Sequence, residues 1–332
     1  MDGGERLIGI NRKCFASAKH FLPGKGYLMK NKKVKIKRYL PVYFMLLPGF
    51  LYLLVNNYIP MAGLIIAFKN LDFSVGILRS EWTGFKNFEF LFRTPDAWRI
   101  TRNTIGYNTV FIIVNLVVAV LFAVLLSEIH SKKAVKTYQT IILLPYMVSM
   151  VIVSYLAYAF LAGDTGLLNG IRHSLGLEPV SWYSEPKYWP VILTLVNAWK
   201  GVGYGAVIYL ASILGIDRSL YEAAAVDGIG KMQEIRYITL PLIKPTVITM
   251  LLLSIGRVFY SDFGLFYQVP MNSGALIDVT NTIDTYVYRG LIALGDISMS
   301  SAAGVYQSVI GFLLVIAANW ITNKLSKENA LF

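Results

Sequence analysis

Eight polar or charged side chains stand within stretches of the sequence that are otherwise apolar. They are Asn108, Tyr155, Asn197, Lys200, Tyr204, Arg257, Tyr260 and Gln307. A polar group is costly to hold inside a membrane span, so each marks a candidate pathway for a solute. Amides and phenols bind hydroxyl-rich solutes such as sugars through hydrogen bonds and aromatic faces, and the two cations would also suit a carboxylate. The eight residues are therefore predicted to line a substrate path.

The same residues also have a structural interpretation, which the sequence leaves open. Lys200 or Arg257 could pair with Asp262 or with a backbone carbonyl inside the bundle, and the asparagines could hydrogen-bond between helices. Catalytic chemistry is not indicated, because nucleophiles and bases do not cluster. The histidines lie on separate segments without partners at metal-ligand spacing, so neither a catalytic site nor a metal site is predicted.

The elements that must position these side chains follow from composition. Hydrophobic residues make up 55% of the 332 residues and charged residues 15%, and the mean hydropathy is +0.54. These values lie outside the usual range of soluble globular proteins. Spanning a bilayer takes roughly 20 mostly apolar residues in a helix, and lipid requires the backbone to satisfy its own hydrogen bonds. We therefore predict an all-α polytopic membrane protein with about six transmembrane helices, at 41–67, 103–127, 138–162, 188–214, 246–267 and 300–322.

The distribution of cations predicts the orientation of these helices. The formal net charge is +12, and much of it precedes the first apolar stretch, at Lys30, Lys32, Lys33, Lys35, Lys37 and Arg38. Positive residues beside a span stay in the cytoplasm, so this basic arm is a topology signal and not a nucleic-acid site. Both termini are then inside a multi-pass protein of the cell membrane. We expect a basic cytoplasmic tail (1–38), a first helix with an outside segment (39–102), a core domain (103–322) with an inside loop at 215–245, and a cytoplasmic tail (323–332).

The inside loop at 215–245 carries the clearest local signals. Asp217 can cap a helix that begins near Arg218, and the alanines at 223–225 favour helix without adding bulk. Gly228 follows where the helix would have to stop, and glycine supplies the left-handed conformation used at such ends. Few large apolar residues lie between Glu222 and Gly230, so a helix lying in lipid is disfavoured. The loop is predicted to present a short, bare helix to another protein.

The residues of this loop carry a resemblance to a known family. Glu222-Ala223-Ala224, Asp227-Gly228 and Ile238-Thr239-Leu240-Pro241 resemble the EAA motif of permease subunits in binding-protein-dependent ABC importers. The Asp-Gly form is similar to the carbohydrate-importing branch, which includes the maltose permeases. Leu46-Leu47-Pro48-Gly49 and Gly84-Phe85-Lys86-Asn87-Phe88 resemble permeases for complex oligosaccharides, such as the alginate-type importers. Ile229 and Arg236-Tyr237 depart from the common pattern.

The resemblance implies a type I ABC importer permease fold and a function as the translocation path for a sugar, expected to be an oligosaccharide. It implies that Glu222 through Gly230 form a coupling helix seated in a cytoplasmic ATPase. The implied docking residues are Glu222, Ala223, Ala224, Asp227, Gly228 and Gly230. The implied partners are a second homologous permease, an ATPase dimer, an extracytoplasmic solute-binding protein, the carbohydrate and membrane lipid.

The chain itself is not expected to hydrolyse ATP. A phosphate-binding loop needs an early glycine, a Gly-Lys pair and a following Ser or Thr, and neither Gly24-Lys25 nor Gly230-Lys231 has these. ATP and Mg are then used by the partner ATPase, and this chain binds no cofactor. Three alternatives stay open: an ABC permease for a non-sugar solute, an ion-gradient-driven carrier using Asp262, and a membrane-embedded enzyme.

Overall fold

The computed structural model describes residues 36–325. The predicted tails at 1–38 and 323–332 therefore lie largely outside the described residues. The chain divides into two compact units, residues 1–62 and 63–332. In the first unit, α2 (Ile36–Leu53) continues through the π-helical turn η1 (Leu54–Tyr58) and α3 (Ile59–Met61). The predicted first span is thus one nearly continuous helical run.

The second unit is built mainly of helices. Its described residues contain one small antiparallel sheet, in which β1 (Lys69–Asn70) pairs with β2 (Glu81–Trp82). The helical elements in chain order are η2 (Ala62–Phe68), η3 (Lys86–Phe88), α4 (Phe90–Arg93), α5 (Pro95–Ser127), α6 (Lys132–Met147), α7 (Met150–Leu161), α8 (Leu167–Ser174), η4 (Trp182–Ser184), η5 (Pro186–Tyr188), α9 (Trp189–Leu214), α10 (Arg218–Val226), α11 (Lys231–Glu234), η6 (Ile235–Thr239), α12 (Leu240–Ile255), η7 (Gly264–Gln268), η8 (Gly274–Leu276), α13 (Ile277–Thr280), α14 (Ile283–Arg289), η9 (Gly290–Leu294) and α15 (Ile297–Leu325).

The predicted six-span architecture is confirmed, with corrections to two spans. Five helical runs of the described residues are long and apolar enough to cross a membrane: Pro41–Phe68, Asp96–Ser127, Pro186–Leu214, Lys231–Ile255 and Ile297–Lys324. The sixth candidate is the pair α6 and α7, bent by 95° at their junction, so the continuous helix predicted at 138–162 is wrong. Ser149 caps α7, because its hydroxyl accepts a hydrogen bond from the Ile152 amide.

The fifth span begins and ends earlier than the predicted range of 246–267. Helix runs from Lys231 to Ile255, so the second half of the predicted loop at 215–245 is helical. Pro241 lies in the first turn of α12, directly after the π-helical turn η6. The wider turn accommodates the missing proline N–H, so the helix continues through Pro241 without a break. The helix then stops before Gly256.

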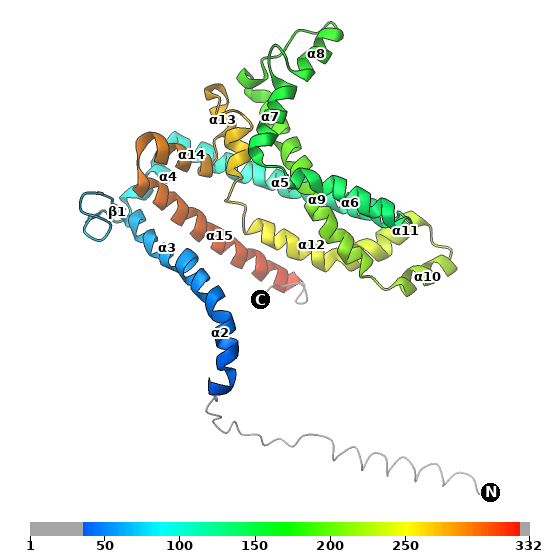
Figure 1. Cartoon of the computed structure of the whole chain (residues 1–332). Coiled ribbons are helices and arrows are strands. Elements are labelled where there is room, and N and C mark those ends of the chain that lie inside the picture. The colour runs from blue at the N-terminus through cyan, green and yellow to red at the C-terminus, as the bar shows by residue number, and fades with distance from the viewer. Residues whose placement is uncertain (1–35, 326–332) are drawn as a thin grey trace, which may run out of the picture. The chain divides into compact units, whose positions relative to one another are not determined.

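Small residues let three spans of the second unit approach closely. Helix α5 packs along α9, and α6 packs on α9 as well (Figure 1). A Cβ placed on Gly203 would lie 1.8 Å from the carbonyl oxygen of Ile142, and one on Gly205 would lie 3.0 Å from the Cβ of Ala119. Gly203 and Gly205 therefore allow α6 and α5 to pack closely against α9.

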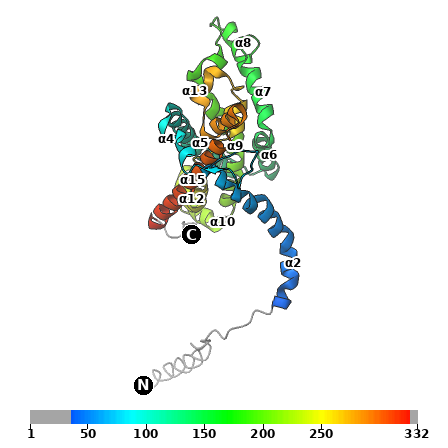
Figure 2. The same cartoon turned by 90° about the vertical axis from the view of Figure 1, so that its left-hand side faces the viewer.

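The loops gather at two ends of this unit. Figure 2 shows α8 and α10 at opposite ends. At the α10 end, the ammonium group of Lys231 lies 3.5 Å from the carboxylate of Glu128. At the other end, the Ser273 hydroxyl donates to the Tyr183 carbonyl over 2.9 Å, and burial raises the pKa of the Tyr183 phenol to about 12.

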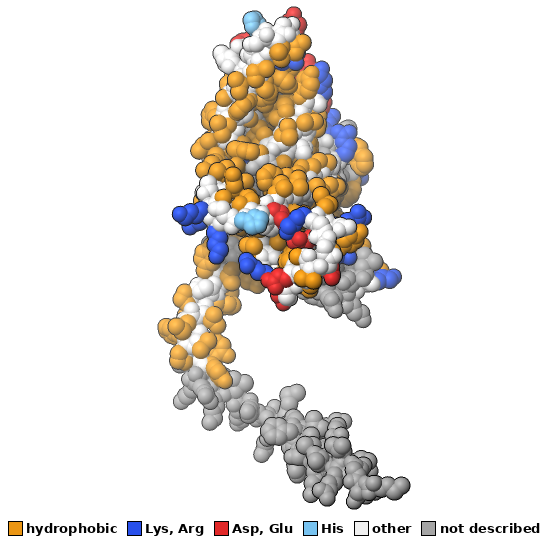
Figure 3. All heavy atoms as spheres, turned by 90° about the vertical axis from the view of Figure 1, so that its right-hand side faces the viewer, with side chains coloured by type: hydrophobic (Ala, Val, Ile, Leu, Met, Phe, Trp, Pro, Cys, Tyr) orange, Lys and Arg blue, Asp and Glu red, His pale blue; other side chains and the backbone are white. Residues whose placement is uncertain are grey.

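Apolar side chains cover much of the face between the α8 end and the charged band near α10 (Figure 3).

We expect Gly203→Ala to destabilise the protein by about 1–3 kcal/mol, because the new methyl group would meet backbone that cannot turn aside. Thermal unfolding of the purified membrane protein measures the effect. Gly106→Ala is the matched control in α5, since a Cβ there would find open space within 4 Å. Equal melting temperatures for the two variants would contradict the close α6–α9 contact.

Candidate functional site

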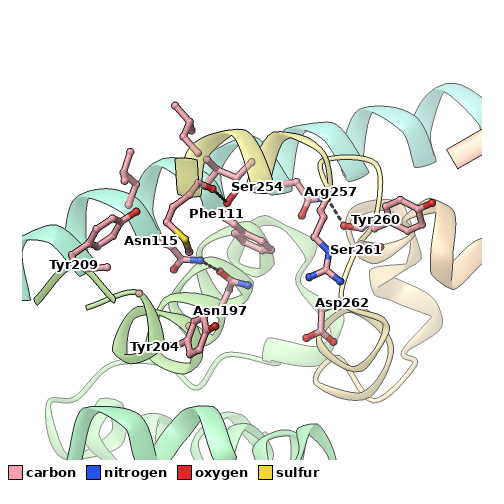
Figure 4. A pocket seen from close by; sticks show the side chains of 18 residues that line it. Phe111, Asn115, Asn197, Tyr204, Tyr209, Ser254, Arg257, Tyr260, Ser261 and Asp262 are labelled. Atoms are coloured by element: carbon pink, nitrogen blue, oxygen red, sulfur yellow. Dashed lines mark hydrogen bonds between the residues drawn. The ribbon is translucent and has the colours of Figure 1, made fainter. Parts of the chain in front are cut away.

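A cavity of about 650 Å³ lies between α5, α9, α12 and the chain that follows α12. Figure 4 shows side chains from all four segments directed toward it. The lining is mixed, with amides, hydroxyls, aromatic rings and two charges among apolar groups. The lining residues are Asn108, Phe111, Ile112, Asn115, Leu116, Ala119, Asn197, Gly201, Tyr204, Gly205, Tyr209, Met250, Leu251, Ser254, Arg257, Tyr260, Ser261 and Asp262.

Two opposite charges lie at one side of the cavity. Arg257 and Asp262 are both exposed, and in Figure 4 the guanidinium group extends toward the carboxylate. Within the described residues, however, Arg257 makes no ion pair within 4.0 Å, so the sequence-based pairing with Asp262 is not formed. One oxygen of Asp262 instead accepts the Leu265 amide over 3.1 Å. The Arg257 cation is therefore open to an anionic group in the cavity.

Asn108 and Asn115 of α5 line the cavity and also bond to other segments of the chain. The amide nitrogen of Asn115 donates to the side-chain oxygen of Asn197 over 2.8 Å (Figure 4). The Asn115 oxygen is buried without a hydrogen-bond partner. Asn108 donates to the carbonyls of Val258 and Tyr260 over 2.9 and 3.1 Å. The alternative of interhelical hydrogen bonding is confirmed for Asn115 and Asn197, whereas Asn108 bonds to the chain that follows α12.

Lys200 has a structural partner and is not among the cavity lining. Its ammonium group donates to the carbonyls of Pro145, Tyr146 and Val148, where α6 ends and the chain turns into α7. Carbonyls at a helix C-terminus carry partial negative charge and lack intrahelical donors, so a cation stabilises them. The backbone-carbonyl alternative is thus confirmed for Lys200. The ring of Tyr204 stacks on Tyr146 at 5.0 Å between centroids, beside this junction.

The structure brings together five of the eight predicted path residues: Asn108, Asn197, Tyr204, Arg257 and Tyr260. Tyr155 is exposed on α7, and Gln307 is buried on α15, where it donates to the Phe259 carbonyl over 2.8 Å. Both lie outside the cavity lining, as Lys200 does. Contact of any of these residues with substrate stays a prediction.

Sequence reasoning did not place several polar lining residues on the path, including Ser254 and Ser261. Ser254 lies in the last turn of α12, three positions before Arg257, and this spacing is the signal that could have found it. Ser261 lies beyond the end of α12, and the sequence pattern does not reveal where α12 ends. Asp262 was considered as a partner for a cation and as the coupling residue of an ion-gradient-driven carrier.

The predicted short helix of the inside loop is present as α10, which spans Arg218–Val226 and so begins at the predicted residue. The coupling helix that the resemblance implied at Glu222–Gly230 is helical only as far as Val226. The carboxylate of Asp217 accepts the Ser219 amide over 2.9 Å, as expected for the cap. Hydrogen bonds from Ser219 lower the pKa of Asp217 below its usual value. Gly228 has φ +73°, the left-handed conformation that ends the helix.

One face of α10 packs inward and the other is bare. Ala224 is buried, and the Tyr221 hydroxyl lies 3.1 Å from the Thr239 hydroxyl on η6. Glu222 and Ala223 are exposed, and Val226 is 89% exposed. A bare face of small side chains beside one carboxylate can approach another protein closely. Docking through Glu222, Ala223, Ala224, Asp227, Gly228 and Gly230 stays a prediction, and Ala224 is the member of this set that faces inward.

Two proteins of Bacillus subtilis are similar to this chain over most of its length. Protein LplB of Bacillus subtilis is 35% identical over 294 residues, which cover 88% of this chain and 92% of that protein. The polygalacturonan/rhamnogalacturonan transport system permease protein YteP of the same organism is 34% identical, covering 90% and 93%.

Solved structures are similar over the same length. A crystal structure of a bacterial ABC transporter involved in the import of the acidic polysaccharide alginate contains a chain with TM-score 0.80 and 32% identity, covering 88% of this chain and 98% of that one. The alginate transporter in complex with an alginate pentasaccharide-bound periplasmic protein gives TM-score 0.79. The family described as binding-protein-dependent transport system inner membrane component matches residues 119–327. The chain belongs to this family of membrane components of transport systems.

Proposed function

We propose that the chain is the permease subunit of an ABC importer and forms part of the translocation path for an oligosaccharide. The observation that carries the proposal is the cavity between membrane-crossing helices, lined by amides, phenols and serine hydroxyls. Such groups exchange hydrogen bonds with sugar hydroxyls, and aromatic rings pack on sugar faces. Relatives named for polygalacturonan and alginate transport support a carbohydrate cargo.

The charge of the cavity supports a carboxylated sugar in particular. Arg257 is exposed to the cavity without an ion-pair partner among the described residues. A guanidinium group binds a carboxylate through two parallel hydrogen bonds. Of the similar proteins named above, one belongs to a transporter described for the acidic polysaccharide alginate, and another is named for polygalacturonan and rhamnogalacturonan transport. An oligosaccharide that contains uronic acid residues is therefore the proposed cargo.

The proposal includes partners, since the sequence of this chain has no phosphate-binding loop motif and another chain must then supply ATP hydrolysis. We infer a second homologous permease, a cytoplasmic ATPase dimer that uses ATP and Mg, and an extracytoplasmic solute-binding protein. The solved complex of the alginate transporter with a periplasmic protein supports the last of these. Cations near Lys132 and Lys231 favour placing the α10 end in the cytoplasm, with both termini inside.

The bare face of α10 is the proposed ATPase-docking surface. In proteoliposomes that hold the full assembly, we expect Glu222→Ala combined with Gly228→Asp to abolish the stimulation of ATP hydrolysis by loaded binding protein. Loss of the carboxylate removes a polar anchor, and an aspartate at φ +73° strains the end of α10.

The matched control for docking is Glu178→Ala, which removes an exposed carboxylate at the opposite end of the second unit. It should leave stimulation unchanged. Co-purification of the ATPase with each variant separates failed docking from failed assembly. Intact assembly together with full stimulation in the double variant would show that α10 is not the docking surface.

Substitutions of Arg257 and Lys200, the two cations of the predicted path, should affect sugar uptake differently. Arg257→Gln removes the open cation, so uptake of a uronic oligosaccharide should fall about tenfold more than uptake of a neutral one. Lys200→Met removes donors to the α6 carbonyls, so it should weaken uptake of both sugars equally through loss of the bend. Uptake of radiolabelled oligosaccharides by the reconstituted transporter measures both effects. Equal losses on the two sugars in Arg257→Gln would rule out a carboxylate-binding role.

A further inference from the structure

The chain leaves helical geometry directly after α12 and forms one side of the cavity there. Helix ends at Ile255, and a turn at 256–259 leads to an irregular segment that reaches Asp262. We call residues 256–262 the cavity loop. Four of its residues, Arg257, Tyr260, Ser261 and Asp262, line the cavity. Irregular backbone at the end of a membrane span is tolerated where protein groups satisfy its polar atoms or where it borders a water-filled cavity.

Side chains of two spanning helices satisfy the carbonyls of the cavity loop. Asn108 of α5 donates to the carbonyls of Val258 and Tyr260, at 2.9 and 3.1 Å. Gln307 of α15 donates to the carbonyl between them, that of Phe259, at 2.8 Å. The Arg257 carbonyl accepts the Tyr260 amide within the loop over 2.9 Å. Four consecutive carbonyls are thus hydrogen-bonded, three of them by side chains from outside the loop.

The carboxylate of Asp284 on α14 accepts hydrogen bonds from the backbone amide and the hydroxyl of Ser261 in the cavity loop. One of its carboxylate oxygens lies 2.7 Å from the Ser261 amide nitrogen and 2.7 Å from the Ser261 hydroxyl. The same oxygen lies 3.2 Å from the side-chain nitrogen of Gln307, which also donates to Phe259. Hydrogen bonds to an ionised acceptor are roughly twice as strong as neutral ones. Asp284 therefore ties the loop to α15 through one atom.

Asp284 and Gln307 do not line the cavity, and Gln307 is 4% exposed. They bond to the backbone and to Ser261 of the loop, whereas Arg257 and Asp262 line the cavity (Figure 4). A side chain held by a loop that fluctuates presents its charge at variable positions, which weakens binding of a ligand that needs one geometry.

We infer that Asp284 and Gln307 are positioning residues that hold the cavity loop in its substrate-binding conformation and thereby set the affinity for the transported solute. The inference rests on the proposed function for its transport readout. Asn108 assists from α5 and also borders the cavity, so its substitution would not separate positioning from contact. Gly256 completes the arrangement, because a Cβ there would lie 2.5 Å from a methyl carbon of Val315 on α15.

The first test measures the loop itself and needs no transport. Cys14 is the one cysteine of the chain, so Cys14→Ser provides a background for a reporter thiol at Arg257→Cys. In the assembled transporter, a charged methanethiosulfonate reagent should label this thiol several times faster when Asp284→Ala or Gln307→Leu is added. Thr249→Val is the matched control on α12, since that hydroxyl donates to the Pro245 carbonyl of its own helix. An unchanged labelling rate in both variants would overturn the inference.

The second test uses the native Arg257 and separates positioning from general damage. For uptake of a galacturonic acid oligosaccharide, Asp284→Ala should raise KM about tenfold while kcat changes less than about twofold. A fall in kcat at unchanged KM would assign Asp284 a different role and overturn the inference. If Asp284→Ala does not assemble, Gln307→Leu leaves the Asp284–Ser261 contacts in place, removes the bonds to Phe259 and Asp284, and should raise KM by a smaller factor. Absence of sugar uptake by the unsubstituted transporter would refute the proposed function, while the labelling result would still decide the positioning role.

Discussion

The structure depends on satisfying backbone polar groups at two places where membrane-crossing helices break. In hydrocarbon each unsatisfied N–H or C=O costs several kcal/mol, so a break persists only where other groups replace the lost helical bonds. At the junction of α6 and α7, the replacement is the Lys200 ammonium group. After α12, it is the amides of Asn108 and Gln307 and the carboxylate of Asp284. Polar residues that a sequence marks as substrate contacts are used first to hold the breaks.

This use of polar groups shapes the cavity. Because Lys200 bonds to the end of α6, its neighbour Tyr204 stacks on Tyr146 and borders the cavity from α9. Gln307 and Asp284 hold the cavity loop by hydrogen bonds, and Arg257 of this loop lines the cavity without an ion-pair partner among the described residues. Carbonyls stabilise the half-buried Lys200 cation at one break, whereas the Arg257 cation at the other break stays open, so two similar residues have different roles.

Local signals in the sequence were sufficient for the number of spans and for the ends of α10, and they did not reveal where two of the spans break. The carboxylate of Asp217 and the left-handed Gly228 act within a few residues of their own position, so residue type and spacing reveal them. The bend after Met147 lies in a mostly apolar stretch, and although Ser149 caps α7, the ammonium group that bonds to the carbonyls of the bend comes from a residue more than 50 positions away. The same holds for the cavity loop, whose partners lie on α5, α14 and α15. Pairings of this range depend on tertiary packing, which hydropathy and propensity do not encode.

One helical run joins the bare face of α10 to the cavity loop. Tyr221 of α10 is hydrogen-bonded to Thr239, which lies in the run Lys231–Ile255, and that run ends one residue before Gly256. At about 1.5 Å per residue, 25 helical residues extend about 37 Å. A helix of this length moves nearly as a rigid body, whereas the irregular cavity loop at its end is the part that can change conformation. A displacement of α10 would therefore move the end of α12 and with it Arg257 in the cavity. The hydrogen bonds from Asp284 and Gln307 would determine how far the cavity loop changes conformation in response.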